Sequence, residues 1–227
     1  MTHDQESNQG GSSGPKAQPK GAGRKTPRDA SDRTLGLTNI WQVLRKLCWE
    51  VELLKAIPAH IQSGTRPVDV LHVQDAKLYA AVNAASTNIA LVDWLYHSIR
   101  NDSALIERSR EVFPGLRTDT DKDFLRSIRG INKSINMCHQ ICNANKHFHL
   151  IEPQSDFKIL VGDLVMEQPD GTTKLGVVTH VVQNGEGIEG RGAVDTMLAD
   201  LVPWWVDVLD RIQLPGRDLF FPGRRNG

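Results

Sequence analysis

Hydrophobic residues recur at helical spacing along most of this 227-residue chain. The first such segment follows Thr38, which can cap a helix, and stops at Pro58, which cannot continue one. Its apolar positions fall on one face of a helix: Ile40, Val43, Leu44, Leu47, Val51, Leu54 and Ile57. The pattern predicts a first helix that buries one side.

A second amphipathic segment follows a polar stretch that contains Gly64 and Pro67. Its apolar residues repeat at alternating steps of four and three: Leu78, Val82, Ala85, Ile89, Val92, Tyr96 and Ile99. A connection that includes a short irregular helix at about residues 105–112 leads to the next break, at Pro114 and Gly115. The repeat from Leu78 to Ile99 therefore predicts a helix that is buried along one side.

The third long helix is predicted from Thr120 or Asp121, with acids in its first turn, to Cys142, and Gly130 can bend it. The last one spans residues 194–212 and ends before Pro215, with Pro203 either kinking it or marking its first turn. Its apolar positions are Val194, Leu198, Leu201, Trp205, Val208 and Ile212.

Between these two helices the periodicity changes. FKILVGDLVM and TKLGVVTHVV are rich in branched residues and flank the turn residues Pro169, Asp170 and Gly171. They predict a β-hairpin at about residues 156–183. The predicted fold is therefore mainly α, a four-helix up-and-down bundle with a β-hairpin inserted before the last helix.

The ends of the chain lack hydrophobic patterning. Residues 1–33 have no aromatic and almost no branched aliphatic residue, which predicts a disordered tail, with a basic stretch from Lys16 to Arg28. The helical-bundle domain is predicted over residues 34–215, and residues 216–227 are a C-terminal extension.

Composition limits the function classes. Lys and Arg together number 27, and Asp and Glu together also number 27. The chain therefore has no net positive charge that would indicate nucleic-acid binding. Three cysteines, two of them one helical turn apart, do not form the framework of a secreted disulfide-rich protein. No signal peptide and no apolar run of membrane-spanning length is present, so we expect a cytoplasmic protein with no membrane partner.

The densest chemistry lies in INKSINMCHQICNANKHFHL, at the end of the third predicted helix. Helical spacing gives it one polar stripe, which contains Asn132, Asn136, His139, Asn143, Lys146 and His147. Such a stripe is either solvated at a helix end or lines a cleft. In a cleft, His147 would be the acid–base group, Lys146 the phosphate anchor and Asn143 their neighbour, a set that suits metal-independent RNA cleavage.

Two further features complete the candidate chemistry. Asp93, followed by Trp94, could orient an imidazole, or could equally be an exposed helix carboxylate. Cys138 and Cys142, completed by His139, His147 or His149, would give a zinc site. The two cysteines are in register with buried isoleucines, where cysteine acts as a small hydrophobe, so we expect neither metal nor cofactor.

IALVDWLYHSI together with ICNANKHFHL resembles a family of uncharacterised bacterial proteins with Asp-Trp and Asn-x-x-Lys-His signatures. Here the signatures are Asp93-Trp94 and Asn143, Lys146 and His147. The helical arrangement is also similar to the HEPN superfamily, whose nucleases carry an Arg four to six residues before a His on one helix. This chain departs from that spacing, and Lys146 would have to replace the arginine.

The HEPN resemblance implies a ribonuclease or an RNA-associated component of defence or toxin systems, with RNA as partner. The alternative is a non-catalytic interaction module that docks a protein partner through the hairpin or forms a homodimer.

Overall fold

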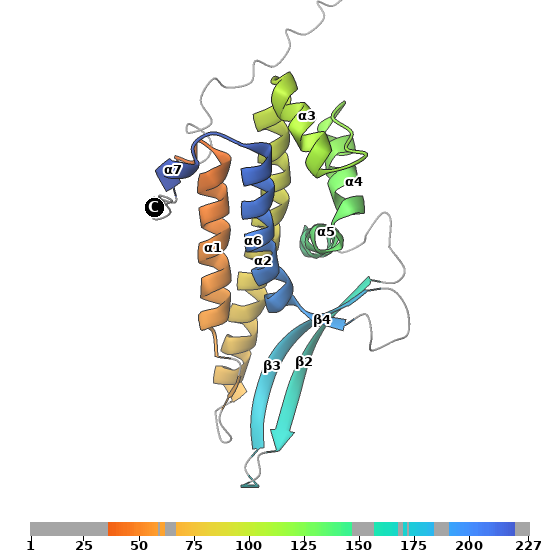
Figure 1. The fold of residues 1–227 in the computed structure, drawn as a ribbon. Helices are drawn as coiled ribbons and strands as arrows, with labels where there is room; N and C mark the ends of the chain where they lie inside the picture. Colours follow the sequence, from red (N-terminus) through yellow and green to blue (C-terminus); the bar gives the residue numbers. More distant parts are fainter. Residues whose placement is uncertain are drawn as a thin grey trace, which may run out of the picture.

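The computed structural model describes residues 36–58, 60–61, 67–146, 157–167, 170–171, 173–183 and 191–220 (Figure 1). The elements in these residues are, in order, α1 (Ile40–Ala56), β1 (His60–Ile61), α2 (Pro67–Ile99), α3 (Ser103–Val112), α4 (Asp121–Ile131), α5 (Lys133–Lys146), β2 (Phe157–Glu167), β3 (Thr173–Gln183), β4 (Arg191–Ala193), α6 (Val194–Ile212) and α7 (Arg217–Phe220). The predicted disordered tail, residues 1–33, lies outside the described residues.

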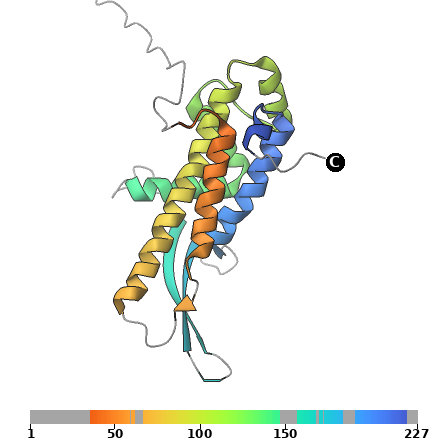
Figure 2. The same cartoon turned by 90° about the vertical axis from the view of Figure 1, so that its left-hand side faces the viewer.

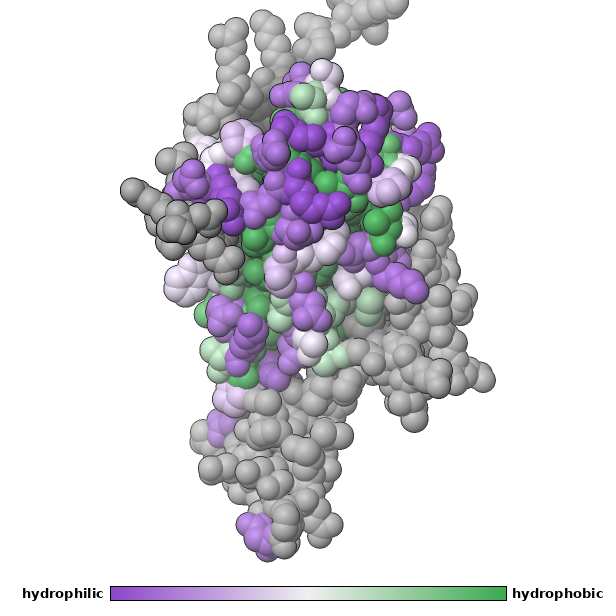
Figure 3. All heavy atoms as spheres, in the orientation of Figure 1, coloured by the Kyte–Doolittle hydropathy of each residue, from purple (hydrophilic) through white to green (hydrophobic). Residues whose placement is uncertain are grey.

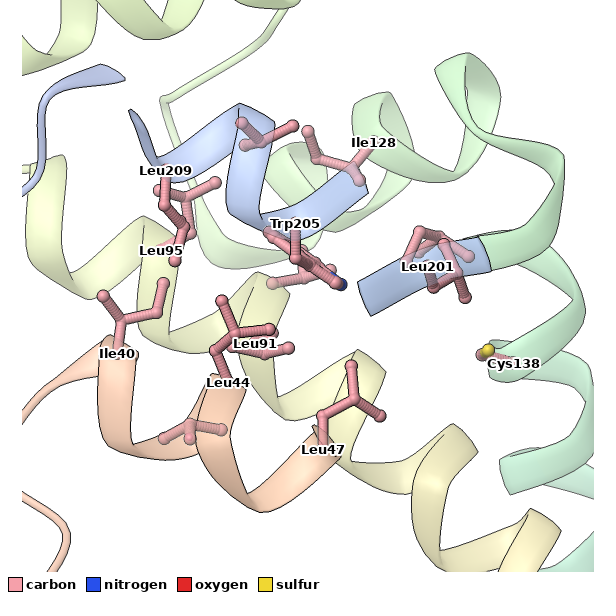
Figure 4. Close-up of a cluster of buried hydrophobic side chains, with 14 of the residues drawn as sticks. Ile40, Leu44, Leu47, Leu91, Leu95, Ile128, Cys138, Leu201, Trp205 and Leu209 are labelled. Carbon is pink, nitrogen blue, oxygen red and sulfur yellow. The ribbon is translucent and has the colours of Figure 1, made fainter. Parts of the chain in front are cut away.

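Three long helices, α1, α2 and α6, lie side by side and form the core of the molecule (Figures 1 and 2). Each contributes fully buried large side chains to it, among them Leu44, Leu91 and Trp205 (Figure 4). On α2 the facing positions include the small residues Ala84 and Ala85, which let the neighbouring helices approach closely.

One buried polar pair is built into this core. The indole N–H of Trp205 in α6 donates to the Asn88 side-chain oxygen in α2 at 2.9 Å. Asn88 in turn donates to the Ala84 carbonyl oxygen at 3.0 Å. Both side chains are fully buried, so these bonds satisfy polar groups that would otherwise be costly to bury.

α1 follows its sequence pattern closely. The predicted inward positions Ile40 and Leu47 are buried, and Pro58 lies beyond the end of the helix. The cap is Asn39 rather than Thr38, because Asn39 and Gln42 form a reciprocal capping box at the first turn.

α2 is longer than its hydrophobic repeat predicted. It begins at Pro67 rather than near Leu78 and has 33 residues, which corresponds to about 50 Å of helix. Proline is favoured in the first turn because its missing N–H would be unsatisfied there anyway, and Asp69 suits the positive end of the dipole.

The strands form one four-stranded sheet. β3 is central: it pairs antiparallel with β2 along one edge, from Phe157 opposite Gln183 to Glu167 opposite Thr173. β1 and β4 pair with the other edge of β3. In the β2–β3 connection, Gly171 has a φ of 77°, a conformation that glycine adopts without strain.

The predicted fold class is wrong in its architecture, although the class is mainly α. The four-helix up-and-down bundle does not form, because the third predicted helix ends at Ile131 and a separate helix, α5, starts at Lys133. α5 runs across the long helices: Figure 1 looks down its axis and Figure 2 shows it from the side. Nor is the strand segment a simple inserted hairpin, because β1 and β4 extend it into a sheet that joins both α1 and α6.

Pro203 lies inside α6, so it does not mark the first turn of that helix. Among the described residues, no helix is both long and apolar enough to cross a membrane.

Candidate functional site

The break at Asn132 places α5 against α4. Asn132 has extended backbone angles, with φ −117° and ψ 108°, and its own N–H still donates to the Ile128 carbonyl of α4. Its side-chain oxygen accepts from the Ile135 N–H at 3.1 Å, which makes it the cap of α5. One asparagine therefore ends one helix and starts the next.

This corner brings one arginine of α4 onto the polar stripe of α5. Arg129 donates from Nε to the Asn136 side-chain oxygen at 2.9 Å, and its Nη1 lies 3.5 Å from Nε2 of His139. The amide nitrogen of Asn143, Nδ2, lies 3.3 Å from the other ring nitrogen, Nδ1. We call these four residues the Arg129 cluster; all four side chains are half-buried.

The Arg129 cluster constrains the histidine tautomer. A guanidinium only donates hydrogen bonds, so Nε2 of His139 faces Arg129 as an acceptor and a neutral ring carries its hydrogen on Nδ1. A half-turn of the Asn143 amide presents its oxygen to that Nδ1–H. A neutral His139 ring in that tautomer has no hydrogen on Nε2, which is the form a general base requires.

The predicted site residues are distributed differently from the sequence hypothesis. Asn143 belongs to the Arg129 cluster. Lys146 is the last residue of α5, but its side chain lies outside the described part, and so does all of His147. Asp93 is exposed on α2, and its carboxylate pairs with His97 of the same helix at 3.5 Å. Of the four predicted residues, the structure thus places only Asn143 in a described polar cluster.

Arg129 is the residue that sequence reasoning missed. Ten residues separate it from His139, and in one continuous helix that spacing would hold the two about 15 Å apart along the axis. They are in contact because the chain turns at Asn132. The available signal was Asn132 itself, a preferred helix cap three residues before an apolar position and two after Gly130.

The zinc alternative finds no site in the described residues. Cys138 is fully buried, and burial raises the pKa of its thiol well above its ordinary value, which opposes the thiolate that zinc needs. The Sγ atom of Cys142 lies 3.5 Å from the Ser86 hydroxyl of α2. No group of three potential metal ligands forms in the part of the chain that the structure describes, and His147 and His149 lie outside it.

Comparison with models of known protein families, with curated proteins and with solved structures finds no match for this chain. A functional proposal therefore rests on the geometry of the chain's own residues.

Proposed function

We propose that the chain is a HEPN-like helical protein that cleaves RNA without a metal ion, with the Arg129 cluster as its site. The observation that supports this is the contact between the Arg129 guanidinium and Nε2 of His139, at 3.5 Å. The HEPN nucleases carry an arginine and a histidine on one helix, and this chain lacks that pair at the expected spacing. The contact between Arg129 and His139 supplies such a pair. The pair is reached across a helix corner instead of along one helix.

Each group has a part in the reaction. Nε2 of His139 takes the proton from a ribose 2′-hydroxyl as its oxygen forms a bond to the adjacent phosphorus. The bond from phosphorus to the 5′-oxygen breaks, and that oxygen takes a proton from water. The hydroxide ion left behind takes the proton from the His139 imidazolium, which restores the neutral ring. The products are a 2′,3′-cyclic phosphate and a 5′-hydroxyl, so atoms and protons balance.

Arg129 would stabilise the phosphate in the transition state. Its planar guanidinium can donate two parallel hydrogen bonds to phosphate oxygens, which a lysine cannot do. At 3.5 Å its contact with His139 is at the outer limit of a hydrogen bond. Asn143, on the far side of the ring, positions the imidazole.

A cleavage assay tests the proposal. The full chain is incubated with end-labelled single-stranded RNA in EDTA near pH 7. We expect cleavage that leaves cyclic phosphate ends, and a loss of about 100-fold or more in His139→Ala and Arg129→Ala. Arg129→Lys should keep part of the rate. His97→Ala, which removes an exposed histidine of α2, is the matched control and should cleave like the parent.

The outcomes separate the two candidate sites. If the parent leaves RNA intact in EDTA, the proposal fails. If the parent cleaves but His139→Ala does so equally well, while Lys146→Ala and His147→Ala are inactive, the site lies at the end of α5 and the Arg129 cluster is structural. Circular dichroism of every variant confirms that a loss of rate is not a loss of fold.

A further inference from the structure

Basic residues follow one face of α4 toward the Arg129 cluster. Lys122, Arg126 and Arg129 are spaced by four and three residues and so share one face of α4. Lys133, the first residue of α5, follows just beyond the break at Asn132. The face opposite this one carries Phe124 and Ile128, which are fully buried. We call the four basic residues the α4 basic stripe.

The α4 basic stripe is open to solvent outside the cluster. Lys122 and Lys133 are exposed, and the Arg126 side chain is 75% exposed. Hydrophilic side chains gather at the end of the molecule where α3 and α4 lie (Figure 3). Lys122 and Arg129 are seven residues apart, so three positive charges follow about 10 Å of helix.

Carboxylates flank the stripe without interrupting it. Asp121 and Asp123 lie on α4 about 100° to either side of it. Asp123 pairs with Arg126 at 3.3 Å and with Arg117 at 3.8 Å. The Asp123 side chain is only 19% exposed and keeps Arg117 and Thr120 as partners, whereas Arg126 is 75% exposed, so Arg126 can leave Asp123 for a phosphate at small cost.

We propose that the α4 basic stripe binds the phosphate backbone of a single-stranded RNA and leads it to the Arg129 cluster. This inference rests on the proposed function, because it names the strand that the cluster would cleave. The charge of the stripe is complementary to a row of phosphates, and such contacts hold a strand without reading its sequence. A single strand fits because one convex helix face can contact one flexible backbone, whereas an A-form duplex presents two rigid ones.

The salt dependence of binding counts these contacts. The probe is a fluorescent single-stranded 2′-O-methyl RNA, which lacks the attacking 2′-hydroxyl and stays intact. For single strands, each neutralised phosphate contributes about 0.7 to the slope of log K against log salt concentration. The double variant Lys122→Gln with Arg126→Gln should therefore lower the slope by about 1.4 and weaken binding several-fold at moderate salt.

The matched control is the double variant Lys55→Gln with Arg211→Gln, which neutralises two exposed basic side chains outside the stripe. Each double variant removes two positive charges, so the net charge of the protein changes equally. Lys55 and Arg211 are also each ion-paired with an acid on their own helix, as Arg126 is. We expect a smaller change in slope than for the stripe variant. Equal slopes for the two double variants would overturn the inference, and so would equal affinity for duplex RNA or for polyglutamate.

Failure of the inference and failure of the proposed function give different results. If the stripe variant binds like the control but the parent still cleaves RNA, the strand follows another path and the site stands. If the slope falls as expected but no RNA is cleaved, the protein binds single strands without cleaving them. Both measurements use the full chain.

Discussion

The buried Asn88–Trp205 pair should couple α2 to α6 energetically. Asn88→Ala leaves the Trp205 indole N–H without its 2.9 Å acceptor in a site that water does not reach. An unsatisfied buried donor costs about 1–3 kcal/mol, so we expect a loss of about 2 kcal/mol in the free energy of unfolding. Trp205→Phe leaves the Asn88 side-chain oxygen without its donor and also removes volume from a filled core. The free energy of unfolding should fall by about 3 kcal/mol.

The double variant is the decisive measurement. Once both partners are gone neither is unsatisfied, so the combined loss should fall short of the sum of the single losses by about 1–2 kcal/mol. Urea unfolding followed by far-ultraviolet circular dichroism measures all three variants, with Asn83→Ala, an exposed asparagine of the same helix, as control. The reasoning is refuted if Asn88→Ala costs no more than Asn83→Ala, or if the two single losses simply add.

Two further predictions concern the corner between α4 and α5 and the reactivity of the cysteine thiols. Asn132→Ala removes the α5 cap and should cost about 1 kcal/mol in the free energy of unfolding. RNA cleavage should fall as far as in Arg129→Ala. Cleavage at the parental rate would show that the corner does not hold Arg129 and His139 together. Burial raises the pKa of the Cys48 and Cys138 thiols, so at pH near 8 each has less reactive thiolate than free cysteine. A thiol reagent should therefore label half-buried Cys48 slowly and Cys138 and Cys142 only after denaturation, whereas rapid labelling of Cys138 in the native protein would contradict its burial.

The parts of the fold that could be predicted are those where local pattern and tertiary packing agree. The inward face of α1 and that of α6 follow directly from helical spacing, because both helices bury a single stripe. The start of α2 at Pro67 was missed because its first turns carry little hydrophobic periodicity, and helix length there depends on neighbours. The sheet pairings of β1 and β4 were beyond reach, because strands of two and three residues carry no pattern of their own.

The helix corner shows why motif spacing alone misjudged the candidate site. A spacing of four residues brings two side chains together only when both lie on one helix, since it then places them on the same face one turn apart. Arg129 and His139 reach contact with a spacing of ten because Asn132 ends α4 and caps α5. The chemistry depends on the distance between guanidinium and imidazole, and the residue that sets this distance is the asparagine between them. A search for arginine and histidine pairs in helical proteins should therefore admit longer spacings wherever a capping residue stands between the two.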